Sequence, residues 1–174
     1  MPLVKGDTIV ADEFVHLADD VELPADGAVL VSAERFFVDP EAALSRSGKE
    51  NAKTGVIWPN NRDVDDLLPH LAKLAVVALV FPIFRDGRAY TQARLLRERH
   101  GFRGELRATG QVLRDQFMFM LRAGFDAFGV KKDSDARAFA EASRRFSVFY
   151  QPTGDGRIPA LRRRLMHMSE SAGS

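Results

Sequence analysis

The amino-acid sequence predicts an α/β fold in which about five mainly parallel strands are joined by crossover helices. From Gly55 onward, strand-like segments start roughly every 20–28 residues, which is the length of one strand with its helix. The segment Val76–Phe84 is apolar throughout, as expected for a strand that is covered on both faces. This pattern fits either an open sheet or half of a (β/α)8 barrel, and both carry functional loops at the carboxyl ends of the strands.

The sequence before Gly55 predicts a small β-rich segment, residues 1–54, that packs on the main domain. Phe14–Leu17 and Ala28–Ser32 contain strand-forming residues, and Pro40–Ser45 is expected to form a short helix. We expect the N-terminal strands to lie at one edge of the sheet. Residues 55–151 then form the α/β core, and residues 152–174 form a basic C-terminal tail, all within a single domain.

The first half of the core is predicted as strand, helix, strand, helix. Val56–Trp58 is a short strand, and Asp63 caps a helix that reaches Leu74. The apolar side chains of that helix follow its period: Val64, Leu67, Leu68, Leu71 and Leu74. After the strand Val76–Phe84, a charged helix continues to about His100 and ends at the glycines that follow.

The second half of the core repeats the alternation. The sequence predicts strands at Glu105–Ala108, Asp126–Val130 and Ser147–Tyr150, with a helix from about Val112 to Arg122 and another that begins at Asp133 or Ser134. The helix from Val112 is apolar on nearly all sides, which predicts deep burial or a contact with a partner.

Composition excludes several classes of function. The formal net charge is +1, which argues against a general binder of nucleic acid or of acidic membranes. The chain contains no cysteine, so it forms no disulfide, thiol redox centre or cysteine-ligated iron–sulfur cluster. The four histidines have no metal-binding spacing, and we expect no metal site. Without a signal sequence or a long apolar span, the expected location is the cytoplasm.

Polar residues at the predicted strand ends form a candidate ligand site. Asn60, Arg88 and Lys131 follow three different strands, and helix N-termini open beside them, which favours binding of a small anion. Arg107 and Gln116 are further candidate ligand-binding residues, and the candidates for catalysis are Asp86, Tyr90 and Asp115. The alternative is that Asp86 is a plain helix cap and that the lysine is solvated.

Asp115 and Gln116 interrupt the apolar helix. A carboxylate in a buried helix has to be paired, and Arg88, Arg107 and Arg122 are the expected partners. The sequence leaves open whether this pair locks the core or acts as a catalytic acid or base.

Three strings resemble a bacterial family known as domain of unknown function 934: FPIFRDGRAYTQARLLR (Phe81–Arg97), GELRATGQVLRDQ (Gly104–Gln116) and RAGFDAF (Arg122–Phe128). The resemblance covers about Gly55 to Arg164. It implies a role beside the enzymes of assimilatory sulfite reduction, where members of the family are associated with oxidoreductase activity. It assigns no chemical role to any of these motifs.

We therefore expect an accessory protein of bacterial sulfur assimilation that binds a small anion or docks to the sulfite-reducing enzymes. One alternative is an oxidoreductase, and hence an enzyme, that holds a flavin or nicotinamide cofactor at a site without a recognisable dinucleotide motif. A second alternative is a structural homodimer without catalysis. The sequence does not decide among these three functions.

Overall fold

One curled sheet organises the protein. The computed structural model describes residues 2–6, 8–46, 52–130 and 133–145, and also residues 160, 162 and 164. Within these residues, eight strands form a single sheet in the order β2-β1-β8-β7-β6-β5-β4-β3. The strands are β1 (Leu3–Lys5), β2 (Thr8–Val10), β3 (Phe14–His16), β4 (Ala28–Ser32), β5 (Lys53–Trp58), β6 (Val76–Phe81), β7 (Glu105–Gly110) and β8 (Ala127–Gly129).

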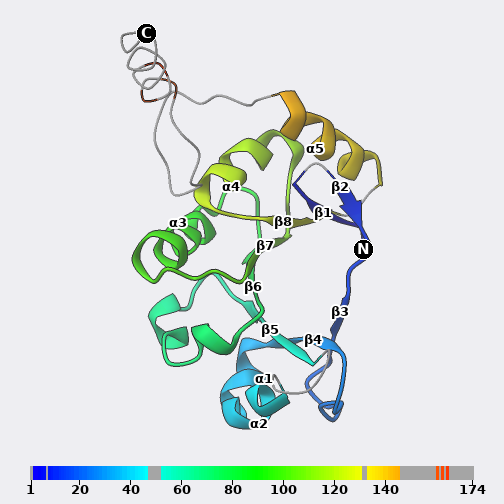
Figure 1. Ribbon diagram of the computed structural model, residues 1–174, viewed down its shortest axis with the longest axis vertical. Coiled ribbons are helices and arrows are strands. Elements are labelled where there is room, and N and C mark those ends of the chain that lie inside the picture. Colours follow the sequence, from blue (N-terminus) through cyan, green and yellow to red (C-terminus); the bar gives the residue numbers. More distant parts are fainter. Residues whose placement is uncertain are drawn as a thin grey trace, which may run out of the picture.

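Strands β3 to β8 are parallel, and each lies beside the next strand in the chain. Strands β1 and β2 are antiparallel and extend the sheet beyond β8. Because neighbouring strands twist in a constant direction, a run of this kind curls toward a barrel. Figure 1 shows an open half-barrel, with the segment between β2 and β3 running along its open side.

Helices cover the outer, convex face of the half-barrel (Figure 1). α3 packs on β6, and α1 packs on β4 and β5, while α4 contacts α3 and α5. The α-helices are α1 (Ala33–Val38), α2 (Pro40–Ser45), α3 (Arg88–Arg94), α4 (Phe117–Ala123) and α5 (Asp133–Arg145). Shorter helical turns are η2 (Val64–Leu67), η3 (Leu71–Lys73), η4 (Leu95–Arg99) and η5 (Arg114–Gln116).

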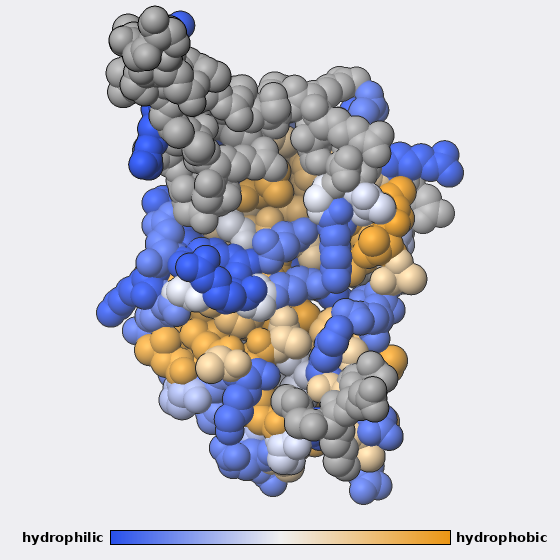
Figure 2. All heavy atoms as spheres, in the orientation of Figure 1, coloured by the Kyte–Doolittle hydropathy of each residue, from blue (hydrophilic) through white to orange (hydrophobic). Residues whose placement is uncertain are grey.

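The two faces of the sheet have separate cores. On the convex face, alternate strand residues such as Val77, Leu79 and Leu106 join the large cluster beneath the helices. On the concave face, a small cluster consists of Phe14, Leu30, Val76 and Ala78. This two-sided burial explains why β6 is apolar at consecutive positions. Figure 2 shows that hydrophobic side chains also reach the surface over the segment between β5 and β6.

The α/β class is confirmed, but the sheet is larger and less uniformly parallel than predicted. The two predicted N-terminal strands, β3 and β4, lie together at one edge of the sheet as expected, whereas β1 and β2, which the sequence did not predict, extend the sheet beyond β8 at the opposite edge. The predicted helix Asp63–Leu74 is wrong. Pro69 lies in its middle and cannot donate a backbone hydrogen bond, and two short 3₁₀ turns form instead.

Other boundaries follow from local chemistry. Ala28–Ser32 and Pro40–Ser45 form the predicted strand and helix. The strand from Val76 ends at Phe81 rather than at Phe84, because Pro82 lacks the N–H that would continue the ladder. Gly124 ends α4 in the left-handed conformation, with φ of 104°, which only glycine adopts readily. The predicted strand Ser147–Tyr150 lies outside the described residues.

Candidate functional site

The loops at the carboxyl ends of β5, β6 and β7 bring together six of the predicted site residues. Asn60 is buried two residues after β5, and Asp86 and Arg88 lie at the start of α3. Gln92 on α3 donates hydrogen bonds to the backbone oxygens of Pro59 (3.1 Å) and Arg62 (2.8 Å), which hold the loop after β5 against that helix. The other three predicted residues here are Tyr90 on α3 and Asp115 and Gln116 on η5. Lys131 lies outside the described residues.

Asp86 and Arg88 form a closed ion pair. Arg88 Nη2 lies 2.6 Å from Asp86 Oδ2, and Arg88 Nε lies 3.0 Å from Oδ1. Hydrogen bonds from the Arg88 side chain, and then from its backbone N–H, hold the pKa of the Asp86 carboxyl well below its usual range. Asn60 adds a weaker contribution, although its buried Nδ2 has no hydrogen bond of good geometry. Asp86 is therefore ionised near neutral pH, which suits it to orient Arg88 rather than to exchange protons.

Tyr90 is half-buried, and its ring packs edge-on against Phe81, with centroids 5.2 Å apart. Burial, with a smaller contribution from the negative charge of Asp115, raises the pKa of Tyr90 to about 12. The phenol therefore keeps its proton at neutral pH and can donate a hydrogen bond. The prediction that Asp115 is buried in an apolar helix is wrong: η5 has no buried residue, and α4 begins only at Phe117.

The perturbed phenol gives a direct spectroscopic prediction. The sequence has two tyrosines, Tyr90 and Tyr150, so a Tyr150→Phe variant isolates the signal of Tyr90. Phenolate absorbance should rise with a midpoint near pH 12, and Asp115→Asn should lower that midpoint. The neutral phenol stabilises the fold below the usual tyrosine pKa of about 10, and this contribution is lost as the pH rises through about 12. A midpoint at the usual value would place Tyr90 in solvent.

Two glutamine side chains fix the backbone of the loop after β6. The Phe84 N–H donates to Gln111 Oε1 at 3.2 Å, and Gln116 Nε2 donates to the Phe84 oxygen at 2.9 Å. The side chain of Phe84 is exposed, and Arg85 lies over its ring, 5.3 Å from the centroid. We define the rim surface as five exposed residues of this loop, of the segment between β7 and α4 and of α4 itself: Ile83, Phe84, Arg85, Leu113 and Phe119.

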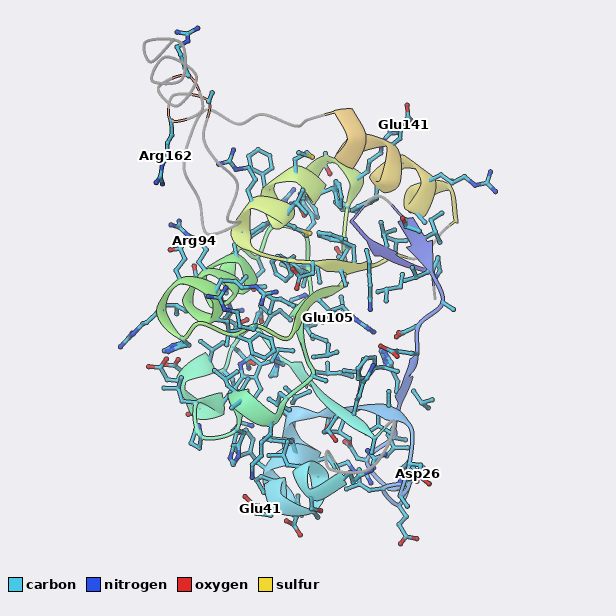
Figure 3. The ribbon with its side chains drawn as sticks, viewed as in Figure 1. Asp26, Glu41, Arg94, Glu105, Glu141 and Arg162 are labelled. Carbon is cyan, nitrogen blue, oxygen red and sulfur yellow. The ribbon has the colours of Figure 1, made fainter. Side chains whose placement is uncertain are left out.

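Arg107 belongs to a different site, on the concave face of the half-barrel. It lies on β7 between Ala78 of β6 and Ala127 of β8, whose small side chains leave room for a guanidinium. Figure 3 shows Glu105, which shares this face of β7, projecting from the middle of the sheet, whereas Glu41 and Arg94 lie on outer helices. The polar contacts of Arg107 thus do not include Asp86 or Arg88, and the predicted single site divides into two.

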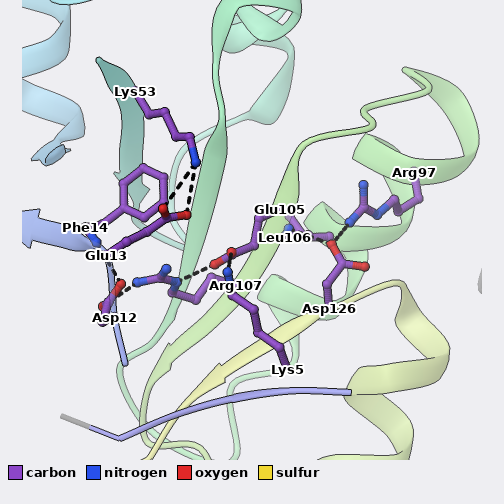
Figure 4. A network of polar contacts seen from close by, with 10 residues as sticks. All are labelled: Lys5, Asp12, Glu13, Phe14, Lys53, Arg97, Glu105, Leu106, Arg107 and Asp126. Atoms are coloured by element: carbon purple, nitrogen blue, oxygen red, sulfur yellow. Dashed lines mark hydrogen bonds and ion pairs between the residues drawn. The ribbon is translucent and has the colours of Figure 1, made fainter. Parts of the chain in front are cut away.

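Two carboxylates bind the Arg107 guanidinium (Figure 4). Its Nη1 lies 2.7 Å from Asp12 Oδ2, and its Nε lies 2.7 Å from Glu105 Oε1. Lys5 Nζ pairs with the other oxygen of Glu105 at 2.6 Å, and the ring of Phe14 stacks 5.4 Å from the guanidinium carbon. Asp12 lies in the segment between β2 and β3 that runs along the open side, and Phe14 is the first residue of β3, so this network ties that segment to the centre of the sheet.

Among the described residues, the third nitrogen of Arg107, Nη2, has no hydrogen-bond partner. The side chain is only 1 % exposed, and Nη2 is buried without a hydrogen bond. A buried donor left unpaired costs about 1–3 kcal/mol. Arg97 offers a contrast, because its Nε, Nη1 and Nη2 atoms are all bonded, to backbone oxygens and to Asp126. Arg97 is therefore a saturated structural residue, whereas Arg107 retains a free donor.

Arg107 also lines a pocket of about 360 Å³ on the concave face. His16, Thr109 and Gly129 in its wall lie at or next to the last residues of β3, β7 and β8, which is where half-barrels and barrels bind ligands. The complete wall consists of Pro2, Leu3, Asp12, Phe14, His16, Arg107, Thr109 and Gly129. Arg107 is the predicted ligand-binding residue that lies in this wall.

Sequence reasoning missed the N-terminal half of this pocket. Asp12 is 95 residues from Arg107 in the chain, and no local pattern connects them. The one available signal was Arg107 itself, a cation inside a predicted strand of the sheet, which has to be paired with carboxylates if it is buried.

Within the described residues, no cluster of three or more histidine, aspartate or glutamate side chains is arranged to hold a metal ion. In that same part of the chain, no helix combines the length and the apolar character needed to cross a membrane.

The fold and its pockets define an open α/β half-barrel protein with polar loops at the carboxyl ends of its parallel strands. Residues 55–161 match the family described as bacterial protein of unknown function (DUF934). The chain belongs to this family, which confirms the resemblance seen in the sequence. No curated protein matches the chain. The family match begins within β5, so Asp12 and Phe14 precede the matched residues.

Proposed function

We propose that this protein is an accessory protein of bacterial sulfur assimilation that docks on the sulfite-reducing enzymes through its rim surface. The metabolic setting comes from the resemblance of its sequence motifs to the family. The support for docking, rather than for chemistry at the rim, comes from the exposure and the rigidity of the residues that form the rim surface.

The observation that carries this proposal is an exposed aromatic loop with a fixed backbone. The two glutamine hydrogen bonds hold Phe84 in place while its side chain faces solvent. Phe119, three residues after Gln116, is 70 % exposed. Exposed apolar patches mark interaction surfaces, aromatic residues carry much of the binding free energy, and a pre-ordered loop loses little entropy on binding.

The charges at the rim favour docking over binding of a small anion. Asp86 already neutralises Arg88, and a free anion would have to displace this carboxylate. Arg85, Arg114 and Asp115 are exposed beside the apolar residues and together carry one net positive charge, so a matching partner has an apolar depression with acidic residues at its border. Binding of a flavin or nicotinamide cofactor and formation of a structural homodimer stay predictions.

The test is a binding measurement between the purified chain and assimilatory sulfite reductase from the same bacterium, by calorimetry or surface plasmon resonance. We expect saturable binding that Phe119→Glu weakens by about tenfold or more, because the variant buries a charge in an apolar contact. Val38→Glu is the matched control, since Val38 is 85 % exposed at the end of α1, away from the rim.

If the wild-type chain does not bind sulfite reductase, the docking proposal is wrong. Equal weakening by Phe119→Glu and Val38→Glu would also count against it, because non-specific adhesion would then explain the binding. Both positions are exposed, so neither variant is expected to unfold the protein.

A further inference from the structure

We propose that the concave pocket binds a small uncharged molecule through a carbonyl oxygen, which accepts a hydrogen bond from Arg107 Nη2. The pocket belongs to the open side of the half-barrel and not to the rim surface, so this ligand site is separate from the proposed docking function.

The shape of the pocket suits a molecule with one polar end. Pro2, Leu3 and Phe14 give its wall an apolar part, and Arg107 and Thr109 give it a polar part. A volume of about 360 Å³ is enough for a small organic molecule, and pockets for such ligands combine an apolar wall with a few fixed polar groups.

The free donor identifies the chemistry of the polar end. The Nε and Nη1 atoms of Arg107 are occupied by Glu105 and Asp12, whereas Nη2 is buried and unpaired. A planar guanidinium directs the remaining N–H groups in its own plane, where they match an sp² oxygen. Thr109 Oγ1 donates to the Leu79 oxygen, so its lone pairs can only accept a hydrogen bond from a ligand.

The charge balance identifies an uncharged ligand. Arg107 and Lys5 carry two positive charges, and Asp12 and Glu105 carry two negative charges, so the network is formally neutral. An anion at Nη2 would lie beside both carboxylates and would make the group net negative. A neutral carbonyl oxygen accepts a hydrogen bond from Nη2 without adding charge to the network.

The experiment compares two probes of one shape, benzamide and benzoate, by backbone-amide NMR of the full chain. We expect benzamide to give saturable shifts at Leu3, Thr109 and Gly129, and benzoate to bind at least about tenfold more weakly. Saturable shifts from neither probe, or tighter binding of benzoate than of benzamide, would overturn the proposal.

Two variants separate the donor from the charge. Asp12→Asn leaves the network with one net positive charge, and we expect benzoate to gain affinity relative to benzamide. The double variant Asp12→Asn with Arg107→Met keeps the network neutral but removes the donor, and we expect loss of benzamide binding with the fold preserved. Unchanged binding of benzamide to the double variant would contradict the proposal that Arg107 donates the hydrogen bond to the ligand. If the double variant does not fold, the comparison of benzamide with benzoate on the wild-type chain tests the proposal by itself.

Discussion

Replacing Arg107 by methionine should lower the free energy of unfolding by about 3 kcal/mol, the lower end of the range for breaking a buried ion pair by removing one partner. The change leaves Asp12 and Glu105 facing each other without their shared cation in a largely desolvated place. Glu105 keeps Lys5, which is why the lower end of the range applies. The measurement is urea denaturation followed by circular dichroism.

The double variant Asp12→Asn with Arg107→Met is the control for this prediction. Removing one carboxylate together with the cation restores the charge balance, so the double variant should be more stable than Arg107→Met alone. If Arg107→Met lowers the free energy of unfolding by less than about 1 kcal/mol, which is the contribution of an exposed ion pair, the network is solvated. The segment across the open side would then be held by Phe14 and not by charge.

The second large effect is expected from Phe117→Ala, which should cost about 3–5 kcal/mol. Phe117 is fully buried, and its ring lies 4.6 Å from that of Phe128 on β8 and 4.5 Å from that of Phe139 on α5. One side chain therefore joins the sheet to two helices, and its removal leaves a cavity between rigid neighbours. The measurement is again the free energy of unfolding in urea.

Phe119→Ala is the matched control, because Phe119 lies on the same helix and is 70 % exposed. Its loss should change stability by no more than about 0.5 kcal/mol. Equal losses for the two variants would mean that α4 does not present one buried and one free face. Together with the docking measurement, this pair separates the stabilising side of α4 from the side assigned to a partner.

Much of the fold could be predicted because its signals are local. The βα alternation, the apolar run of β6 and the glycine at the end of α4 each depend on neighbouring residues alone. The expected helix after Asp63 does not form because Pro69, which is itself a local signal, interrupts it. The burial of Asp115 failed because the helix begins later than its apolar pattern suggests, after an exposed turn.

The candidate sites were less predictable, because their geometry depends on the curl of the sheet. Asn60, Asp86, Arg88 and Tyr90 do gather where parallel strands end, as the alternation alone implies. The sequence predicts that Arg88 is available to bind an anion. Only the side-chain geometry shows that Asp86 already neutralises it. Arg107 points to the other face of the sheet, since side chains alternate along a strand.

By itself, the sequence determined the α/β class, the order of most strands and helices, the family, and the absence of thiol chemistry. Only the tertiary structure decided that the sheet is an open half-barrel and that β2 and β3 form its opposite edges. Only the tertiary structure shows that Asp12 pairs with Arg107. The reason is physical. The periodicity and the caps of helices depend on residues a few positions apart in the chain, whereas the partner of a buried charge comes from wherever the folded chain brings an opposite charge close, here 95 residues away.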